Sequence, residues 1–187
     1  MSRDLAQGFE TGAGSNRRRE GVHADVTAVI ALGANLGDRA DTIEAALAEL
    51  ARLPLTRLID AAEPRESVAL TPSGRDESAP GYLNTVARIR TRLAPSVLLD
   101  HLHAIEERHG RARRSAGQAR WQDRTLDLDL IVYGEVVSDA AALVLPHPRA
   151  AEHDFVLAPW LELDADAVLP GRGRVADLLR ALLEEPR

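Results

Sequence analysis

The chain has 187 residues, of which 45% are hydrophobic and 28% are charged, as in an ordinary globular protein. Its formal net charge of -6 argues against nucleic acid or an anionic membrane surface as a partner, and no apolar run reaches the length of a membrane span. Cysteine is absent, which excludes disulfides, thiolate metal sites and cysteine nucleophiles. We expect a monomeric, cytoplasmic protein.

The first 25 residues differ from the rest of the chain. They lack the apolar stretch of a signal peptide and are too acidic for a typical transit peptide. Their composition predicts a disordered polar tail over 1–25, followed by a single domain over 26–187.

Residues 26–33 predict a buried strand, which ends in a glycine-containing turn, "GANLGD" (33–38). This turn lacks the Gly-Lys-Ser/Thr ending of a P-loop, so we expect a tight turn and no phosphate cradle. Apolar residues at helical spacing then predict a helix with a capping box at Asp41 and Glu44, which ends before Pro54.

The middle of the chain predicts two strands and a second helix. The first strand covers 55–71 with an interruption near Pro64, and a loop of turn-forming residues follows over 72–81. Alternating apolar residues predict a strand over 82–91. A helix over 95–109 begins with proline, and its predicted inner face carries Val97, Leu102 and Ile105.

The last third begins with a loop over 111–120, which has no apolar periodicity. A strand over 126–133, a short strand over 135–137 and an edge strand over 142–149 are predicted next. Two helices finish the chain, and the last has an apolar stripe formed by Val175, Leu178, Leu179, Leu182 and Leu183.

The element order is therefore β-α-β-β-α-β-β-β-α-α. Helices separated by pairs of strands predict the α+β class, with a ferredoxin-like α/β sandwich around a mainly antiparallel sheet.

The strand over 126–133 carries acids where apolar side chains are usual. One face has the alternating residues Leu126, Leu128, Leu130 and Val132. The other face is predicted to carry Asp127, Asp129, Ile131 and Tyr133. Side chains at i and i+2 of a strand leave the same face about 6–7 Å apart at the backbone. Two such carboxylates can converge on Mg²⁺ ions, although a solvated strand face explains the pattern equally well.

Arginines crowd the segment before this strand: Arg108, Arg111, Arg113, Arg114, Arg120 and Arg124. A guanidinium group matches phosphate oxygens with two parallel hydrogen bonds. For any single arginine a solvated loop position is the simpler interpretation. Arginines and paired acids together favour an Mg–nucleotide site.

Several other residues have both a structural and a functional interpretation. His147, in "LPHPR", either donates to a phosphate or makes a structural hydrogen bond. Tyr82, Trp121 and Phe155 stand out because aromatic residues make up only 3% of the chain, yet each could belong to a core. Asn84 lies on a predicted strand, where an amide is expected to pair with another polar group.

Five blocks occur in the order "LGANLGD", "TP", "APGYLN", "RWQDRTLDLDLIVYG" and "LPHPR…F". Over roughly 28–170 the chain thereby resembles the 6-hydroxymethyl-7,8-dihydropterin pyrophosphokinases of folate biosynthesis. The resemblance implies transfer of the β,γ-pyrophosphoryl unit of ATP to the hydroxymethyl group of a reduced pterin, with release of AMP.

The resemblance also implies roles for particular residues. Asp127 and Asp129 would hold two Mg²⁺ ions. The ATP contacts would come from Glu106, Arg111, Arg113, Arg124 and His147, with Arg120 in a mobile catalytic loop. Catalytic roles would belong to Arg111, Arg113, Arg120 and Asp129. The pterin would meet Thr71, Pro72, Tyr82, Asn84, Trp121 and Phe155.

The chain departs from the family pattern at a few positions. Ala79 stands where many members have Gln, His153 where an Arg is frequent, and Ala34 where a Ser is frequent. The loop between Arg113 and Arg120 is a few residues longer than common.

Three other functions remain open from the sequence. One is a different Mg²⁺-dependent nucleotidyl or glycosyl transferase, because D-x-D pairs recur in such sites. Another is a ferredoxin-like RNA-binding module, which predicts stacking aromatics and a basic face. The third is a relative that has lost activity, although both aspartates are present.

Overall fold

The computed structural model describes residues 25–71, 74–76, 81–110 and 125–184, so all but the last residue of the predicted tail lies outside the described residues. The main sheet has five strands, four of which follow the order β2 (Thr56–Ala61), β6 (Tyr82–Thr91), β1 (Val26–Ala34) and β7 (Asp127–Tyr133). All neighbouring pairs are antiparallel, and β3 (Arg65–Ser67) also pairs with β6, beyond the end of β2.

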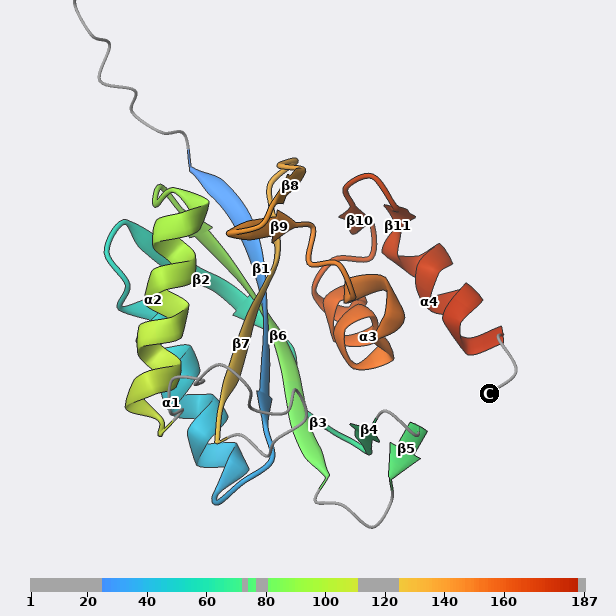
Figure 1. The fold of residues 1–187 in the computed structure, drawn as a ribbon, viewed down its shortest axis with the longest axis horizontal. Helices are drawn as coiled ribbons and strands as arrows, with labels where there is room; N and C mark the ends of the chain where they lie inside the picture. The colour runs from blue at the N-terminus through green and yellow to red at the C-terminus, as the bar shows by residue number, and fades with distance from the viewer. Residues whose placement is uncertain (1–24, 72–73, 77–80, 111–124, 185–187) are drawn as a thin grey trace, which may run out of the picture.

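Helices cover both faces of this sheet (Figure 1). On one face α1 (Arg39–Ala51) and α2 (Pro95–Arg108) enclose a first core, whose largest buried side chains are Ile30, Leu32, Ile43, Leu50, Ile89, Leu98, Leu102, Ile105, Leu126 and Leu128. On the other face α3 (Asp154–Leu163) and α4 (Val175–Glu184) enclose a second core, which includes Val29, Val86, Ile131, Val156, Leu157, Trp160 and Val175. The predicted α+β sandwich around an antiparallel sheet is confirmed.

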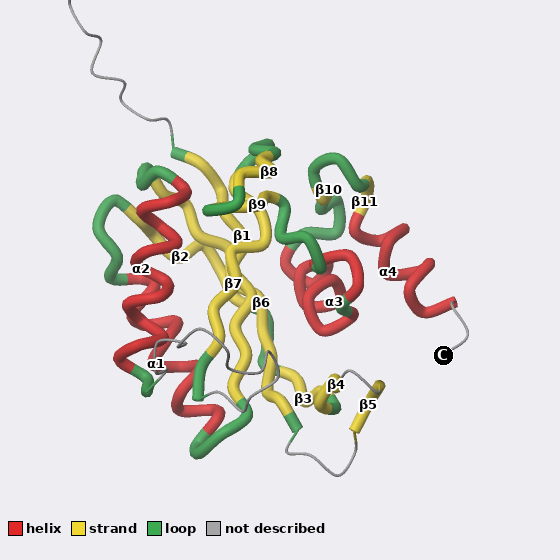
Figure 2. The backbone as a smooth tube through the Cα atoms, viewed as in Figure 1, coloured by secondary structure: helices red, strands yellow, loops and turns green. Residues whose placement is uncertain are grey.

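Three short hairpins and a single turn of 3₁₀ helix complete the described chain (Figure 2). The hairpins pair β4 (Ala69–Thr71) with β5 (Gly74–Asp76), β8 (Ser138–Ala140) with β9 (Leu143–Leu145), and β10 (Val168–Leu169) with β11 (Gly173–Arg174). The 3₁₀ turn covers Ala150–Glu152. Within the described part of the chain, no helix is long and apolar enough to cross a membrane.

The two short strands predicted after β7 are wrong in position and in partner. No strand forms over 135–137, because Gly134 has a φ of 52° and starts a turn, so that the strand begins at Ser138. The edge strand predicted over 142–149 is observed only as the three residues of β9, because the prolines that follow have no N–H to donate. It pairs with β8 in a hairpin of its own and does not extend the main sheet.

The interrupted strand near Pro64 is confirmed, since β2 ends at Ala61 and β3 begins at Arg65. The predicted loop over 72–81 is wrong in part, because β5 lies within it and pairs with β4.

The first turn of α1 begins earlier than predicted. Asp38 is the N-cap, and its side chain accepts a hydrogen bond from the N–H of Asp41 at 3.1 Å. The capping box predicted at Asp41 and Glu44 is therefore wrong. The strand before it also runs further, so that Gly33 belongs to β1 and not to the turn.

Two helical residues face away from the core that was predicted for them. On α2 the inner position belongs to the fully buried Leu98, whereas Val97 is 42% exposed. On α4 Leu183 is 63% exposed, because the stripe turns away from the sheet in the last turn of this helix. The bounds of both helices otherwise agree with the prediction.

A β-bulge changes the faces of β7. Val29 pairs with Val132 whereas the next residue, Ile30, pairs with Leu130, so Ile131 is an extra residue on β7. Ile131 and Val132 both join the second core, and Tyr133 joins the first core, where its hydroxyl donates to the Leu93 carbonyl. The predicted strict alternation is therefore wrong at Val132 and Tyr133, although it holds for both aspartates.

Candidate active site

A row of residues crosses the main sheet at the end that bears β3. Asn84 of β6 pairs with Gly33 of β1, and Gly33 pairs on its other side with Asp127 of β7. Two residues further along each strand, a second row on the same face joins Val86, Ala31 and Asp129. Because paired residues and every second residue of a strand share a face, all of these side chains lie on the face of the second core.

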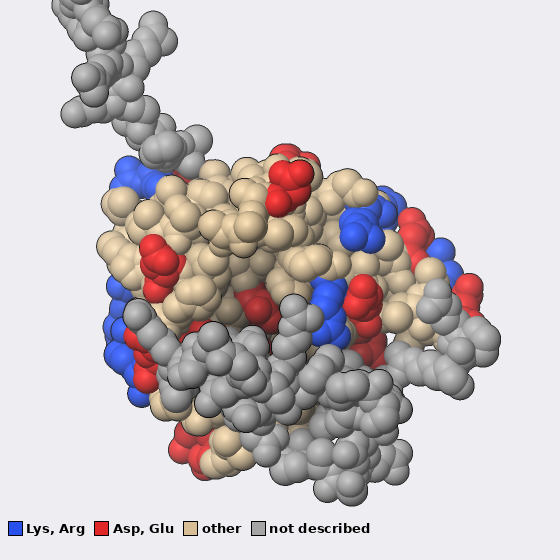
Figure 3. Space-filling model, viewed as in Figure 1, with Lys and Arg blue, Asp and Glu red and all other residues tan. Residues whose placement is uncertain are grey.

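This face is apolar at one end and polar at the other. Val29, Val86 and Ile131 contact the α3 and α4 layer, whereas Asn84 and Asp127 lie nearer the end of the sheet where β3 pairs. Figure 3 shows a hollow near the middle of the view with acidic atoms at its base, and basic and acidic side chains interspersed around it. The polar side chains of this face therefore lie beyond its apolar contacts with α3 and α4, towards the end of the sheet where β3 pairs.

Tyr82 and Asn84 occupy alternate positions at the start of β6 and share this face with both aspartates. Asn84 is only 8% exposed, and its amide pairs with another polar side chain, as the sequence predicted. Ser67 of β3 is that partner and lies opposite Tyr82 in the register.

The two aspartates are half-buried carboxylates on one strand face, as their spacing predicted. The ring of His147 approaches them, with 4.0 Å between its Nε2 and the Oδ1 of Asp129. Its backbone N–H donates to the Ile131 carbonyl at 2.8 Å, which fixes the segment after β9 along the outer edge of β7.

The donor set fits a hard, oxygen-preferring cation. Carboxylates that share one face can take part in Mg²⁺ coordination, and this ion usually completes its shell with water and substrate phosphates. Among the described residues no group of three or more His, Asp or Glu side chains forms a closed metal cage.

Glu106 lies on the other side of β7. It is 1% exposed, and its Oε1 accepts a hydrogen bond from the backbone N–H of Leu128, between the two aspartates, at 2.8 Å. The described contact is thus with the strand that carries the carboxylates, and the predicted contact with ATP stays a prediction.

Phe155 is the second residue of α3 and packs against the second core. The ring of His153 stacks on it, with 4.6 Å between the centroids and 20° between the planes. Burial, and after it the nearby cation Arg149, lower the pKa of His153 to about 4, so this imidazole is neutral at pH 7. The position where related chains often carry an arginine therefore holds an uncharged ring.

The remaining predicted site residues are not placed. Pro72, Arg111, Arg113, Arg120, Trp121 and Arg124 lie outside the described residues. Thr71 is described only as the last residue of β4, where it pairs with Gly74.

Sequence reasoning missed two residues that the structure brings to this end of the sheet. Ser67 and Arg39 both hydrogen-bond to groups around the start of β6. The sequence held a signal for Ser67. It stands two residues after Arg65 in the strand that follows Pro64, so the period of two places both side chains on one face of that strand. Arg39 carried no signal, since it stands among ordinary surface residues at the start of a helix.

Comparisons with known proteins identify the family of this chain. The family model described as 7,8-dihydro-6-hydroxymethylpterin-pyrophosphokinase (HPPK) matches residues 29–165. Among curated proteins, the 2-amino-4-hydroxy-6-hydroxymethyldihydropteridine pyrophosphokinase of Haemophilus influenzae is 37% identical over 155 residues, which are 83% of this chain and 92% of that protein. The protein of the same name from Pseudomonas aeruginosa is 40% identical over 152 residues, which are 81% of this chain and 89% of that protein.

Solved structures support the same fold. A Plasmodium falciparum HPPK-DHPS crystal structure superposes with a TM-score of 0.63 at 11% identity, over 87% of this chain and 46% of that one. An HPPK-DHPS structure in complex with substrates gives a TM-score of 0.64 at 12% identity, over 86% of this chain and 44% of that one. The chain thus spans slightly less than half the length of these solved proteins, and the likeness shows the fold alone. On the family model and the curated relatives, this chain belongs to the 7,8-dihydro-6-hydroxymethylpterin-pyrophosphokinase family.

Proposed function

We propose that this chain transfers the β,γ-pyrophosphoryl unit of ATP to the hydroxymethyl group of 6-hydroxymethyl-7,8-dihydropterin and releases AMP, as a step of folate biosynthesis. The observation that carries the proposal is the row Asn84–Gly33–Asp127, together with Asp129 two residues further along β7 on the same face. An amide suited to a heterocycle and two carboxylates suited to a cation on triphosphate oxygens stand side by side on one sheet face. Family membership supports the same reaction.

The pterin subsite is proposed around the start of β6. Asn84 offers both a donor and an acceptor to the polar edge of the ring. Tyr82 lies two residues away on the same face and supplies a stacking surface, with Phe155 of α3 as the opposing ring. Trp121 and the backbone near Thr71 and Pro72 are proposed to complete the subsite.

The phosphate subsite is proposed along the edge of β7. Asp127 and Asp129 would hold two Mg²⁺ ions, which when bound neutralise charge on the phosphate oxygens of ATP. His147 is positioned to donate to the nucleotide, because its ring lies beside Asp129 on this edge. Glu106 is proposed to act near the nucleotide, and Arg111, Arg113, Arg120 and Arg124 are proposed to contact its phosphates.

The main contribution of the protein to this reaction is to orient the two substrates. The pterin hydroxyl attacks the β-phosphorus, the bond from this phosphorus to the α-phosphate bridging oxygen breaks, and AMP leaves with that oxygen. Asp129 is proposed to accept the hydroxyl proton. The stacked aromatic rings exclude water from the reacting atoms, which suppresses hydrolysis of ATP.

Two further assignments belong to the same proposal. The protein is proposed to act as a monomer. A cytoplasmic location is proposed because ATP and the reduced pterin are intracellular metabolites.

The test is a coupled AMP-release assay with MgATP, with and without 6-hydroxymethyl-7,8-dihydropterin. Pterin-dependent AMP formation is the expected result. A different Mg²⁺-dependent transferase would give no pterin-dependent AMP and no pterin binding. A relative that has lost activity would bind both ligands without turnover, and an RNA-binding module would bind neither.

A further inference from the structure

The amide of Asn84 is held from two sides. Its Nδ2 donates a hydrogen bond to the Oγ of Ser67 at 2.6 Å. Its Oδ1 lies over Gly33, where an added Cβ would come within 2.9 Å of that oxygen. Real Cβ atoms do not approach an oxygen so closely, so only glycine at 33 leaves the carbonyl side of the amide in this position.

Ser67 reaches Asn84 because of the register between β3 and β6. Arg65 pairs with Asn84 and Ser67 pairs with Tyr82, so Ser67 is the diagonal neighbour of Asn84 on the same face. The hydroxyl therefore lies beside the amide and beside the first ring of the proposed pterin subsite.

The short strand that carries Ser67 is tied down independently. Both guanidinium nitrogens of Arg39 donate to the Glu66 carboxylate at 2.8 Å, and Nη1 also donates to the Gly81 carbonyl at 2.7 Å. On the face of β3 opposite to Glu66, Arg65 forms an ion pair with Glu162 of α3 at 2.5 Å. Each of the first two residues of β3 thus forms an ion pair, and these ion pairs hold the three-residue strand in one position. The side chain of its third residue, Ser67, is held in place with it.

We propose that Ser67 is a positioning residue that holds the Asn84 amide in place for the pterin ring. The inference rests on the proposed function, in which Asn84 contacts the pterin. With one Nδ2 hydrogen engaged by Ser67, the second Nδ2 hydrogen and Oδ1 remain for the ring edge. Without Ser67 the Asn84 side chain loses this hydrogen bond and is free to leave the rotamer that meets the ring, which weakens binding of the pterin.

The decisive experiment is a double-mutant cycle between Ser67→Ala and Asn84→Ala, read as KM for the pterin, KM for ATP and kcat. Ser67→Ala is expected to raise the pterin KM about five- to tenfold, the effect of one net hydrogen bond, with the ATP KM unchanged. In the Asn84→Ala background the same change is expected to have no further effect, because the group that Ser67 orients is gone. Ser67→Thr keeps a hydroxyl and is expected to restore most of the pterin affinity.

Ser138→Ala is the matched control. The Ser138 hydroxyl also makes a hydrogen bond to a neighbouring strand, where it donates to the Leu143 carbonyl at 2.8 Å, but Ser138 lies in β8, away from the site row. It is expected to leave the pterin KM unchanged. Gly33→Ala provides a second variant that disturbs the same amide from its other side, and it is expected to raise the pterin KM as well.

The outcomes separate this inference from the proposed function. If the wild-type chain neither binds the pterin nor forms pterin-dependent AMP, both are overturned. If the wild type is active and Ser67→Ala has a normal pterin KM, or raises it equally in the Asn84→Ala background, only the role of Ser67 is overturned. A rise in the ATP KM and the pterin KM together, with a lowered Tm, would also overturn it, since that result marks a general loss of structure.

Discussion

The carboxylate of Glu106 accepts a hydrogen bond from the backbone N–H of Leu128, with 2.8 Å between Oε1 and the nitrogen. Leu128 stands between Asp127 and Asp129, and β7 ends the main sheet. Helix α2 thus supplies the acceptor that a further strand would otherwise provide. A buried side chain from one face of the sheet thereby holds the backbone that presents the two aspartates on the other face.

Glu106→Ala is expected to lower the free energy of unfolding by about 1–3 kcal/mol, because it leaves the Leu128 N–H buried without its acceptor. Glu106→Gln keeps an oxygen in place and should lower it by less. Urea denaturation followed by circular dichroism measures both, with the exposed neighbour Glu107→Ala as control. Equal stability of the Glu106→Ala and Glu107→Ala variants would show that the bond contributes nothing. A raised ATP KM in Glu106→Gln would support the separate prediction that this residue contacts the nucleotide.

Asp129→Asn is expected to lower kcat by at least about a hundredfold while the Tm stays within a degree or two of the wild type. The amide has the same shape but no charge, so it neither holds Mg²⁺ nor accepts the proton of the pterin hydroxyl. The coupled AMP-release assay measures the loss. The control is Asp139→Asn, which removes a charge from an exposed position of β8. Normal turnover in Asp129→Asn would mean that Asp129 is a solvated strand residue with no part in catalysis.

The site face could be predicted from the sequence to the extent that strand periodicity fixes it. A period of two put Asp127 with Asp129 on one face, and the structure agrees. The fold class followed from the order of the elements. Residue roles inside the arginine-rich segment lie outside the described residues and stay predictions.

Other features could not be predicted because they depend on contacts between distant segments. The bulge at Ile131 exists only relative to β1, so the alternation of β7 alone gave the wrong face for Val132 and Tyr133. Gly33 reads as a turn glycine in isolation, and only the neighbouring Asn84 side chain explains why it has no Cβ. The cap at Asp38 was hidden because Asp41 and Glu44 offered an equally good local pattern.

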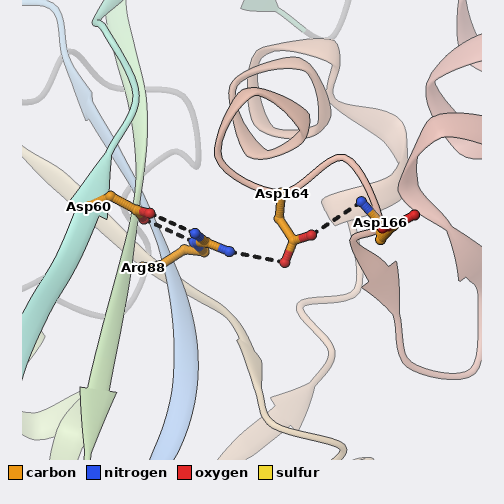
Figure 4. A network of polar contacts seen from close by, with 4 residues as sticks. All are labelled: Asp60, Arg88, Asp164 and Asp166. Carbon is orange, nitrogen blue, oxygen red and sulfur yellow. Dashed lines mark hydrogen bonds and ion pairs between the residues drawn. The ribbon is translucent and has the colours of Figure 1, made fainter.

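Arg88 joins the sheet to the end of α3 through two carboxylates (Figure 4). Its Nε and Nη2 donate to both oxygens of Asp60 on β2, at 2.9 and 2.6 Å, and its Nη1 donates to Asp164 at 2.9 Å. Hydrogen bonding to the Asp60 carboxylate is the main reason that the pKa of Arg88 is raised. Asp164 is itself fixed, since it accepts from the N–H of Asp166 at 3.1 Å.

Arg88→Met is expected to lower the free energy of unfolding by about 1–3 kcal/mol, because it leaves two partly buried carboxylates without their cation. The exposed Arg90→Met, two residues along the same strand, should change it by less than about 0.5 kcal/mol. Urea denaturation at pH 7 compares the two variants. If the two losses are equal, the network does not hold α3 on the sheet.

His153 makes stability depend on pH in a direction that its burial fixes. Its pKa falls from 6.5 to about 4 on folding, first through burial and then through Arg149, so the unfolded chain binds the proton more tightly than the folded chain. The free energy of unfolding therefore falls as the pH drops from about 6.5 towards 4, and at higher pH this contribution is absent. Replacement by the uncharged His153→Leu should remove that part of the slope, so the variant should lose less stability between pH 7 and pH 5 than the wild type.

Urea denaturation at pH 7, 6 and 5 measures the slope, and the exposed His103→Leu on α2 is the matched control, expected to retain the wild-type slope. Because carboxylates titrate in the same range in every variant, only the difference between variants reports on His153. Identical slopes for His153→Leu and wild type would mean that the folded chain protonates this ring as readily as the unfolded chain does. The ring stacked on Phe155 would then carry a positive charge near pH 6, as the arginine frequent at this position in the family does at every pH.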